Sequence, residues 1–109
     1  MKENLTFNVM IESDKSRMEL LGIFLSSLPG STIEGAYIRY EGNILELGKN
    51  ISYDEEKARC DEDAWMYYRF DLTVFPEGQA EGESQVELAN KILAIVRDCN
   101  GRAELVADF

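Results

Sequence analysis

The chain has 109 residues and a formal net charge of −10, from 21 acidic and 11 basic side chains, and it contains no histidine. Hydrophobic residues make up 45% and charged residues 29%, a composition that excludes a disordered chain. The length predicts one domain over residues 1–109. The acidic excess argues against nucleic acid and anionic membranes, whose phosphates attract Lys and Arg. It permits a basic partner protein, or it serves solubility alone.

The N-terminus and the cysteines favour a cytoplasmic protein. Met1 is followed by Lys-Glu-Asn rather than by a basic and then an apolar run, so we expect no signal peptide. No apolar stretch approaches the roughly 20 residues that cross a bilayer. In the cytoplasm Cys60 and Cys99 are expected as reduced thiols, with a disulfide as the alternative.

The N-terminal half predicts a strand, a helix and a hairpin. Apolar and polar side chains alternate over residues 5–11, which indicates a strand with one buried face. Ser16 and Glu19 form a capping-box pattern that opens a helix, and Pro29-Gly30 ends it. Two strands then follow, over residues 36–40 and 44–47, joined by a tight turn at Glu41-Gly42-Asn43.

The C-terminal half predicts a polar loop, a strand, a helix and a final strand. Residues 48–63 are the most polar segment, and its part 50–63 is expected as a peripheral loop without a metal. The strand over 65–75 stops at Pro76, and Ser84-Gln85-Val86-Glu87 repeats the capping-box pattern at the start of an amphipathic helix. Asn100-Gly101 supplies a left-handed helix stop, and residues 102–109 form the last strand.

The element order is therefore β-α-β-β-β-α-β. Right-handed crossovers place both helices on one face of an antiparallel sheet, an α+β ferredoxin-like sandwich with an extra hairpin strand. The matched periodicities predict a set of core residues beneath the helices: Phe24, Leu28, Tyr68, Phe70, Leu93 and Val96.

No catalytic constellation, cofactor motif or metal site is recognisable in the chain. The polar loop holds six carboxylates: Asp54, Glu55, Glu56, Asp61, Glu62 and Asp63. A calcium loop starting at Asp54 would need glycine at its sixth position and glutamate at its twelfth, where Arg59 and Trp65 stand. The loop is either a solvated acidic segment or a docking surface for a basic partner.

Three single residues have structural interpretations. Asp71 is expected to pair across the sheet with Arg102 or Arg39. Cys60 has no histidine to act as its base and is expected to be a surface thiol. Cys99 falls on the apolar half of the second predicted helix and is expected to be a small core residue.

Two protein classes that share this element order are excluded. Binding of RNA would need a glycine-bearing motif and basic residues beside the aromatics of the 65–75 strand. Acylphosphatases would need a glycine-rich loop after the first strand, where Glu12-Ser13-Asp14-Lys15-Ser16 stands instead.

Strand parity predicts a second candidate surface, on the sheet face that the helices leave open. That face would carry Tyr37, Arg39, Tyr67 and Arg69, with Met10 and Val106. Tyr and Arg are enriched at interface hot spots. The alternative is an ordinary exposed sheet face with Tyr–Arg stacking between strands.

Two stretches of the C-terminal half carry a resemblance to a known family. One runs from Asp61 to Pro76 and includes an acidic turn, Tyr67-Tyr68-Arg69 and the proline stop; the other runs from Gln85-Val86 to the Ala107-Asp108-Phe109 ending. Together they resemble the Sit-type immunity proteins, small cytoplasmic proteins that protect bacteria from a sibling's toxin. The resemblance implies a toxin domain as the partner and transfers no catalytic residue.

These observations predict a non-enzymatic binding protein, an immunity protein that neutralises a bacterial toxin by occlusion. The acidic loop and the open sheet face would make the contact. The alternative is a small ligand-binding or regulatory domain that forms a homodimer through its sheet. An enzyme that uses Tyr, Asp and Arg is the third hypothesis, and it would need a deep pocket with carboxylates of raised pKa.

Overall fold

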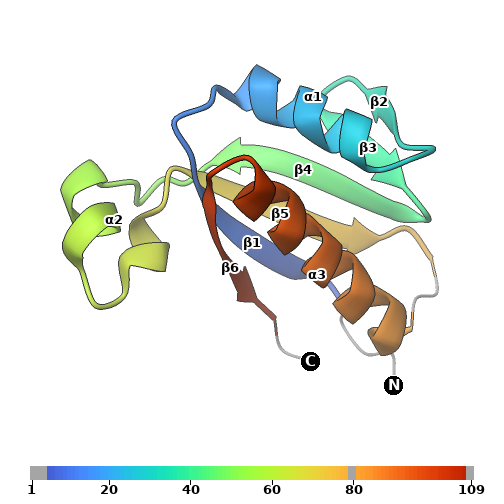
Figure 1. Cartoon of the computed structure of the whole chain (residues 1–109). Coiled ribbons are helices and arrows are strands. Elements are labelled where there is room, and N and C mark those ends of the chain that lie inside the picture. The colour runs from blue at the N-terminus through green and yellow to red at the C-terminus, as the bar shows by residue number, and fades with distance from the viewer. Residues whose placement is uncertain (1–4, 79–80, 108–109) are drawn as a thin grey trace.

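A computed structural model describes residues 5–78 and 81–107 (Figure 1). The strands are β1 (Phe7–Glu12), β2 (Thr32–Glu34), β3 (Tyr37–Tyr40), β4 (Asn43–Lys49), β5 (Phe70–Pro76) and β6 (Arg102–Val106). The helices are α1 (Arg17–Ser27), α2 (Glu55–Cys60) and α3 (Gly82–Asp98), with a 3-10 turn η1 at Ala64–Tyr67. No helix in the described part of the chain is both long and apolar enough to cross a membrane.

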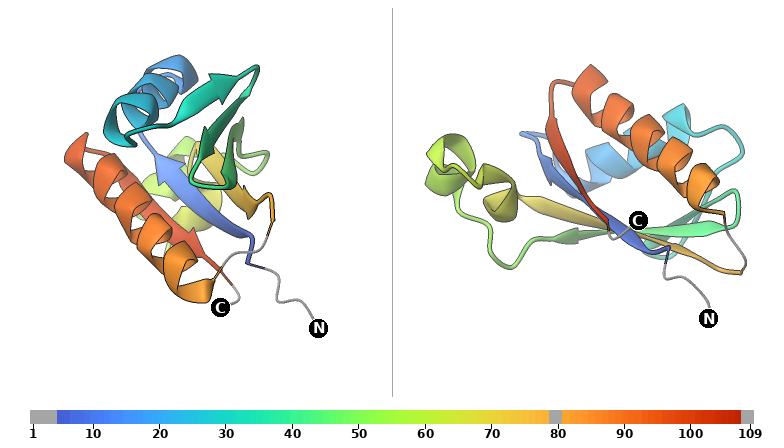
Figure 2. Two further views of the ribbon diagram at one scale, coloured as in Figure 1. Left: turned by 90° about the vertical axis from the view of Figure 1, so that its right-hand side faces the viewer. Right: turned by 90° about the horizontal axis from the view of Figure 1, so that it is seen from below.

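The six strands form one antiparallel sheet in the order β2-β3-β4-β5-β1-β6. Helices α1 and α3 lie side by side on one face of it (Figure 2). The predicted α+β class, with an antiparallel sheet and two helices on one face, is confirmed. The inner order β4-β5-β1-β6 is compatible with a ferredoxin-like arrangement. β2 and β3 extend the sheet beyond β4, so the complete order is not clearly the ferredoxin-like one.

Local signals decide most of the element ends. At the start of α1, Ser16 Oγ accepts a hydrogen bond from the Glu19 backbone N–H at 3.1 Å, and Glu19 Oε1 accepts from the Ser16 N–H at 3.2 Å. The predicted capping box is therefore confirmed. The Glu41-Gly42 turn is also confirmed, since both residues have positive φ, as a two-residue hairpin turn requires.

The two ends of α3 compare differently with the prediction. The helix begins at Gly82 after Glu81, so the capping box predicted at Ser84 is wrong. Gln85 is instead buried, and its Nε2 donates to the carbonyl of Leu5 and to Asn43 Oδ1. At the other end Asn100 adopts a left-handed φ of 67°, as the Asn100-Gly101 pattern predicts.

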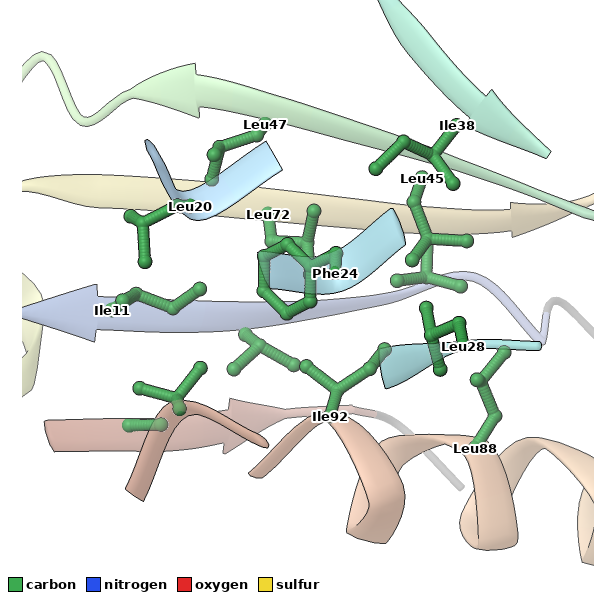
Figure 3. Packing of buried hydrophobic residues seen from close by; sticks show 14 of the residues in the cluster. Ile11, Leu20, Phe24, Leu28, Ile38, Leu45, Leu47, Leu72, Leu88 and Ile92 are labelled. Carbon is green, nitrogen blue, oxygen red and sulfur yellow. The ribbon is translucent and has the colours of Figure 1, made fainter. Parts of the chain in front are cut away.

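The hydrophobic core lies between the sheet and the two long helices (Figure 3). Phe24, Leu28, Phe70 and Val96 belong to it as predicted, and Leu93 packs against its border. Tyr68 is buried, but it belongs to a second, smaller cluster with Met10 and Ala58, on the opposite face of the sheet. Its predicted place beneath the helices is wrong, because β5 starts only at Phe70.

The largest departure from the sequence prediction is the segment of residues 50–69, here called the arm. The expected loop over 50–63 contains α2, and the first part of the expected strand over 65–75 is the turn η1. The arm projects from the end of the sheet at which β4 finishes and β5 begins (Figure 1). β6 ends at Val106, and the predicted inward position of Phe109 lies outside the described residues.

Candidate functional site

Asn50 joins the two ends of the arm. Its Nδ2 donates to the carbonyl of Met66 at 2.9 Å and to that of Tyr68 at 2.8 Å. Its Oδ1 accepts from the Ser52 N–H at 3.1 Å, and its own backbone N–H donates to the Arg69 carbonyl. Asn50 is buried, so these groups are satisfied away from water. The arm therefore leaves the sheet with a fixed base.

A small apolar cluster seats the arm against the sheet. Tyr68 and Ala58 pack on Met10, a residue of β1 that points away from the helices. Arg102 of β6 donates from Nη2 to the Ala58 carbonyl at 2.8 Å, and its guanidinium lies 5.1 Å from the Tyr68 ring centroid. Contacts from β1 and β6 thus position α2.

The six predicted carboxylates all lie in the arm, but some have local structural uses. Asp54 caps α2 by accepting from the Lys57 N–H at 3.0 Å, and Asp61 Oδ1 accepts from the Asp63 N–H at 2.9 Å. Glu55 forms an exposed ion pair with Arg59 at 3.6 Å. The side chains of Glu56, Glu62 and Asp63 have no hydrogen bond or ion pair within the described residues. These last three carboxylates are the ones available to a partner.

The open face is the sheet face opposite α1 and α3. By strand register its side chains include one row of Glu34, Tyr37, Glu46, Thr73, Asn8 and Val106, and a second row of Asp71, Met10 and Glu104. Met10 and Val106 are on this face as predicted. Carboxylates outnumber cations along both rows, so the open face and the arm have the same sign of charge.

The four aromatic and basic residues predicted to share the open face are divided between two regions. Tyr37 and Arg39 lie on β3 and are exposed. Tyr67 and Arg69 precede β5 and belong to the arm, so their predicted position on a strand is wrong. Tyr67 is half-buried against the small cluster, and Lys57 Nζ lies 4.9 Å from its ring centroid.

The ion pairs on the open face also differ from the prediction. Arg39 pairs with Glu34 at 2.7 Å and with Glu77 at 3.3 Å, not with Asp71. Asp71 instead accepts a hydrogen bond from Asn8 Nδ2 at 2.7 Å. The Asn8 amide lies on β1, the direct neighbour of β5, whereas Arg39 lies on β3, two strands away. The other predicted partner, Arg102, donates to the Ala58 carbonyl instead.

Arg69 is the most constrained cation of the arm. Its Nη2 donates to the Tyr53 hydroxyl at 3.1 Å, and its guanidinium lies 5.2 Å from the Tyr53 ring centroid. This hydrogen bond raises the pKa of Arg69 above its ordinary value. Its backbone N–H donates to Glu12 Oε1 at 2.9 Å. Arg69 therefore links the arm to β1. Of the four residues, Tyr37 is the one whose side chain has no hydrogen bond, ion pair or ring contact within the described part of the chain.

Two hollows lie on the surface of the described residues. One, of about 240 Å³, lies between the β3–β4 turn and the start of α3, and its polar lining consists of Glu41, Asn43, Glu81, Ser84 and Gln85. A shallower one, of about 390 Å³, lies on α2 beside the exposed thiol of Cys60.

Cys99 packs against the core, as predicted for it. Within residues 5–78 and 81–107, no three acidic or cysteine side chains are grouped as metal ligands.

Sequence reasoning missed Asn50, Ile51 and Met66. Asn50 stands at the start of the polar segment, two residues before Ser52, and this spacing is typical of the side-chain turn that it forms. Nothing in the sequence marks Ile51 and Met66 as exposed. In the predicted strand over 65–75, Met66 would share a face with Tyr68 and Phe70, two of the predicted core residues.

Comparison with known proteins adds no relative. No family model, curated protein or solved structure matches this chain.

Proposed function

We propose that this protein is a non-enzymatic binding protein that holds a basic partner protein with the arm and the neighbouring open face. The observation that carries the proposal is the way in which the arm is held to the sheet. Hydrogen bonds of the buried Asn50 and contacts from Arg102 fix a projecting segment. Three of its carboxylates, Glu56, Glu62 and Asp63, have no hydrogen bond or ion pair within the described residues. A fixed binding segment loses little conformational entropy when it docks.

Electrostatics supports a basic partner. The chain has a net charge of −10, and the arm adds unpaired carboxylates to an already acidic sheet face. Complementary charge speeds association and discriminates against wrong partners. The resemblance to the Sit-type immunity proteins implies that the partner is a bacterial toxin domain and that the complex forms in the cytoplasm, and both are part of this proposal.

A homodimer through the sheet is the competing function. Face-to-face pairing of two copies would bring together two acidic faces, each with Glu46, Asp71 and Glu104, and like charges in an interface oppose association. The short edge strands β2 and β6 offer an alternative route to a dimer.

The test is co-expression with the C-terminal domain encoded by the gene immediately upstream, scored by cell survival and by binding kinetics. The variant Glu62→Lys/Asp63→Lys reverses two arm carboxylates that have no structural use. We expect its association rate to fall about tenfold at low ionic strength, with little change in dissociation.

The matched control is Glu83→Lys/Glu87→Lys on α3, which changes the net charge equally but lies on the helix side of the sheet. Equal slowing by both variants would reduce the effect to net charge and remove the arm from the proposal. Survival of cells that lack this protein altogether would contradict the immunity function, and a dimeric free protein would favour the competing one.

A further inference from the structure

Ile51 is the most exposed large apolar residue in the described part of the chain. Its exposed fraction is 101%, compared with 70% for Met18, which comes next. Single exposed apolar side chains are ordinary on protein surfaces, so exposure alone assigns no role to either residue. The backbones of both residues are held, that of Met18 by the capped first turn of α1, but Ile51 stands on the arm, beside its carboxylates, and Met18 on a helix that packs on the core.

The backbone around Ile51 is fixed from both sides. Asn50 Oδ1 accepts from the N–H of Ser52, so a hydrogen bond spans Ile51 itself. The Asn50 carbonyl accepts from the Tyr53 N–H at 3.1 Å, which closes the same turn. A β-branched side chain also has few rotamers. The turn therefore holds the backbone of Ile51 before any partner arrives, and the branched side chain has a restricted χ1 although it is fully exposed.

Met66 provides a second exposed apolar side chain at the same base. It is 44% exposed, and its carbonyl accepts from Asn50 Nδ2, so the chain positions that carry the two apolar residues are tied together. The arm that carries both residues holds six carboxylates and three cations, Lys57, Arg59 and Arg69. Protein interfaces combine apolar side chains at the centre with polar and charged ones at the rim.

We infer that Ile51 is the apolar anchor of the arm, and that it enters an apolar pocket bordered by Lys and Arg on the partner protein. This inference rests on the proposed function, and it names the residue that dominates the dissociation rate of the proposed complex. Charge complementarity selects the occupant. A second copy of this chain would bring carboxylates to the same site, and an anionic membrane would repel the arm.

The experiment uses the full chain in its source cells, with a benzophenone amino acid placed at position 51, 37 or 86 in separate strains. Position 51 tests the anchor, position 37 tests the open face, and position 86 is an exposed apolar control on α3. We expect position 51 to photo-crosslink to one discrete protein that contacts it through a basic surface. Position 86 should give no discrete crosslinked product.

Binding of that protein to purified variants then tests the anchor. Ile51→Ser should weaken affinity roughly thirtyfold, mostly through faster dissociation, since loss of a hot spot acts in this way. Val86→Ser should leave affinity unchanged. Asn50→Ala should also weaken affinity while Ile51 is present, with faster amide exchange at Tyr53, which would confirm that the fixed turn matters.

The remaining outcomes are distinguishable. Crosslinking from position 37 but not from position 51 would overturn the anchor and keep the proposed binding function. Crosslinking of position 51 to a lipid or to a second copy of this chain would overturn the inferred partner. If no position crosslinks to a protein, the inference and the proposed function are both overturned. An affinity that Ile51→Ser leaves unchanged would overturn the anchor alone.

Discussion

The two hydrophobic clusters of this protein lie on opposite faces of one sheet and are built in different ways. The large cluster draws on β1, β3, β4, β5 and both long helices, and Phe24, Leu45 and Ile92 in it are fully buried. The cluster under the arm has only Met10, Ala58 and Tyr68 as buried members. In the arm, hydrogen bonds from side chains to the backbone hold the segment in place, whereas in the main core burial of apolar side chains does so.

This difference separates stability from recognition. Burial in the main core stabilises the whole domain, whereas the arm depends on a few contacts that open at lower free energy. A segment that is fixed but contributes little to the global fold is free to vary its surface residues for a partner. Variants in the two regions should therefore differ in which part of the chain they unfold and in how far they lower the free energy of unfolding.

Removal of a core side chain should have the largest effect. Phe24→Ala deletes a fully buried ring between α1 and the sheet, and we expect a loss of about 3–5 kcal/mol in the free energy of unfolding. Denaturant unfolding measures it. A loss below about 0.5 kcal/mol, the value typical of a surface site, would contradict the central place of α1 in the core.

Removal of Tyr68 should loosen the arm and spare the core. Tyr68→Ala takes away the main apolar contact of the arm and the ring that Arg102 faces, at a local cost of about 2 kcal/mol. Amide exchange should speed up at Tyr53 and Asp54, whose hydrogen bonds close the arm. Equal acceleration at the β1 and β5 amides would mean that arm and core open as one unit, and the comparison would fail.

The two predicted capping boxes offer a matched pair of smaller effects. Ser16→Ala should cost about 1 kcal/mol, because Ser16 Oγ accepts from the Glu19 N–H. Ser84→Ala should cost less than half as much, since α3 starts two residues earlier and does not use Ser84 as its cap. Equal losses in thermal unfolding would show that Ser84 caps the helix after all.

The smallest effect is expected at the exposed ion pair of the arm. Glu55→Gln removes the partner of Arg59 at 3.6 Å, and we expect less than about 0.5 kcal/mol because both side chains are exposed. Glu56→Gln, which breaks no pair in the described residues, is the control. The difference between the two variants should vanish in about 1 M salt, where screening is strong; a larger difference would indicate that the pair holds α2 in place.

The fold class was accessible from the sequence because the relevant signals are local and periodic. Alternation over residues 5–11 predicts β1 and its buried face, the Ser16–Glu19 pattern predicts the start of α1, and Glu41-Gly42 predicts the hairpin turn. Each of these signals acts within a few residues, and at these three places the tertiary structure agrees with it. The equally local pattern at Ser84 is not used, because α3 begins earlier, at Gly82.

The candidate site was decided by the tertiary structure. Residues 65–75 alternate in the sequence as one strand would, yet hydrogen bonds from Asn50 to the carbonyls of Met66 and Tyr68 turn the first part of this stretch into the arm. Tyr67 and Arg69 leave the open face for the same reason. The partner of an Asn side chain more than ten residues away is not encoded in local periodicity, and neither is the exposure of Ile51, which depends on how the arm meets the sheet.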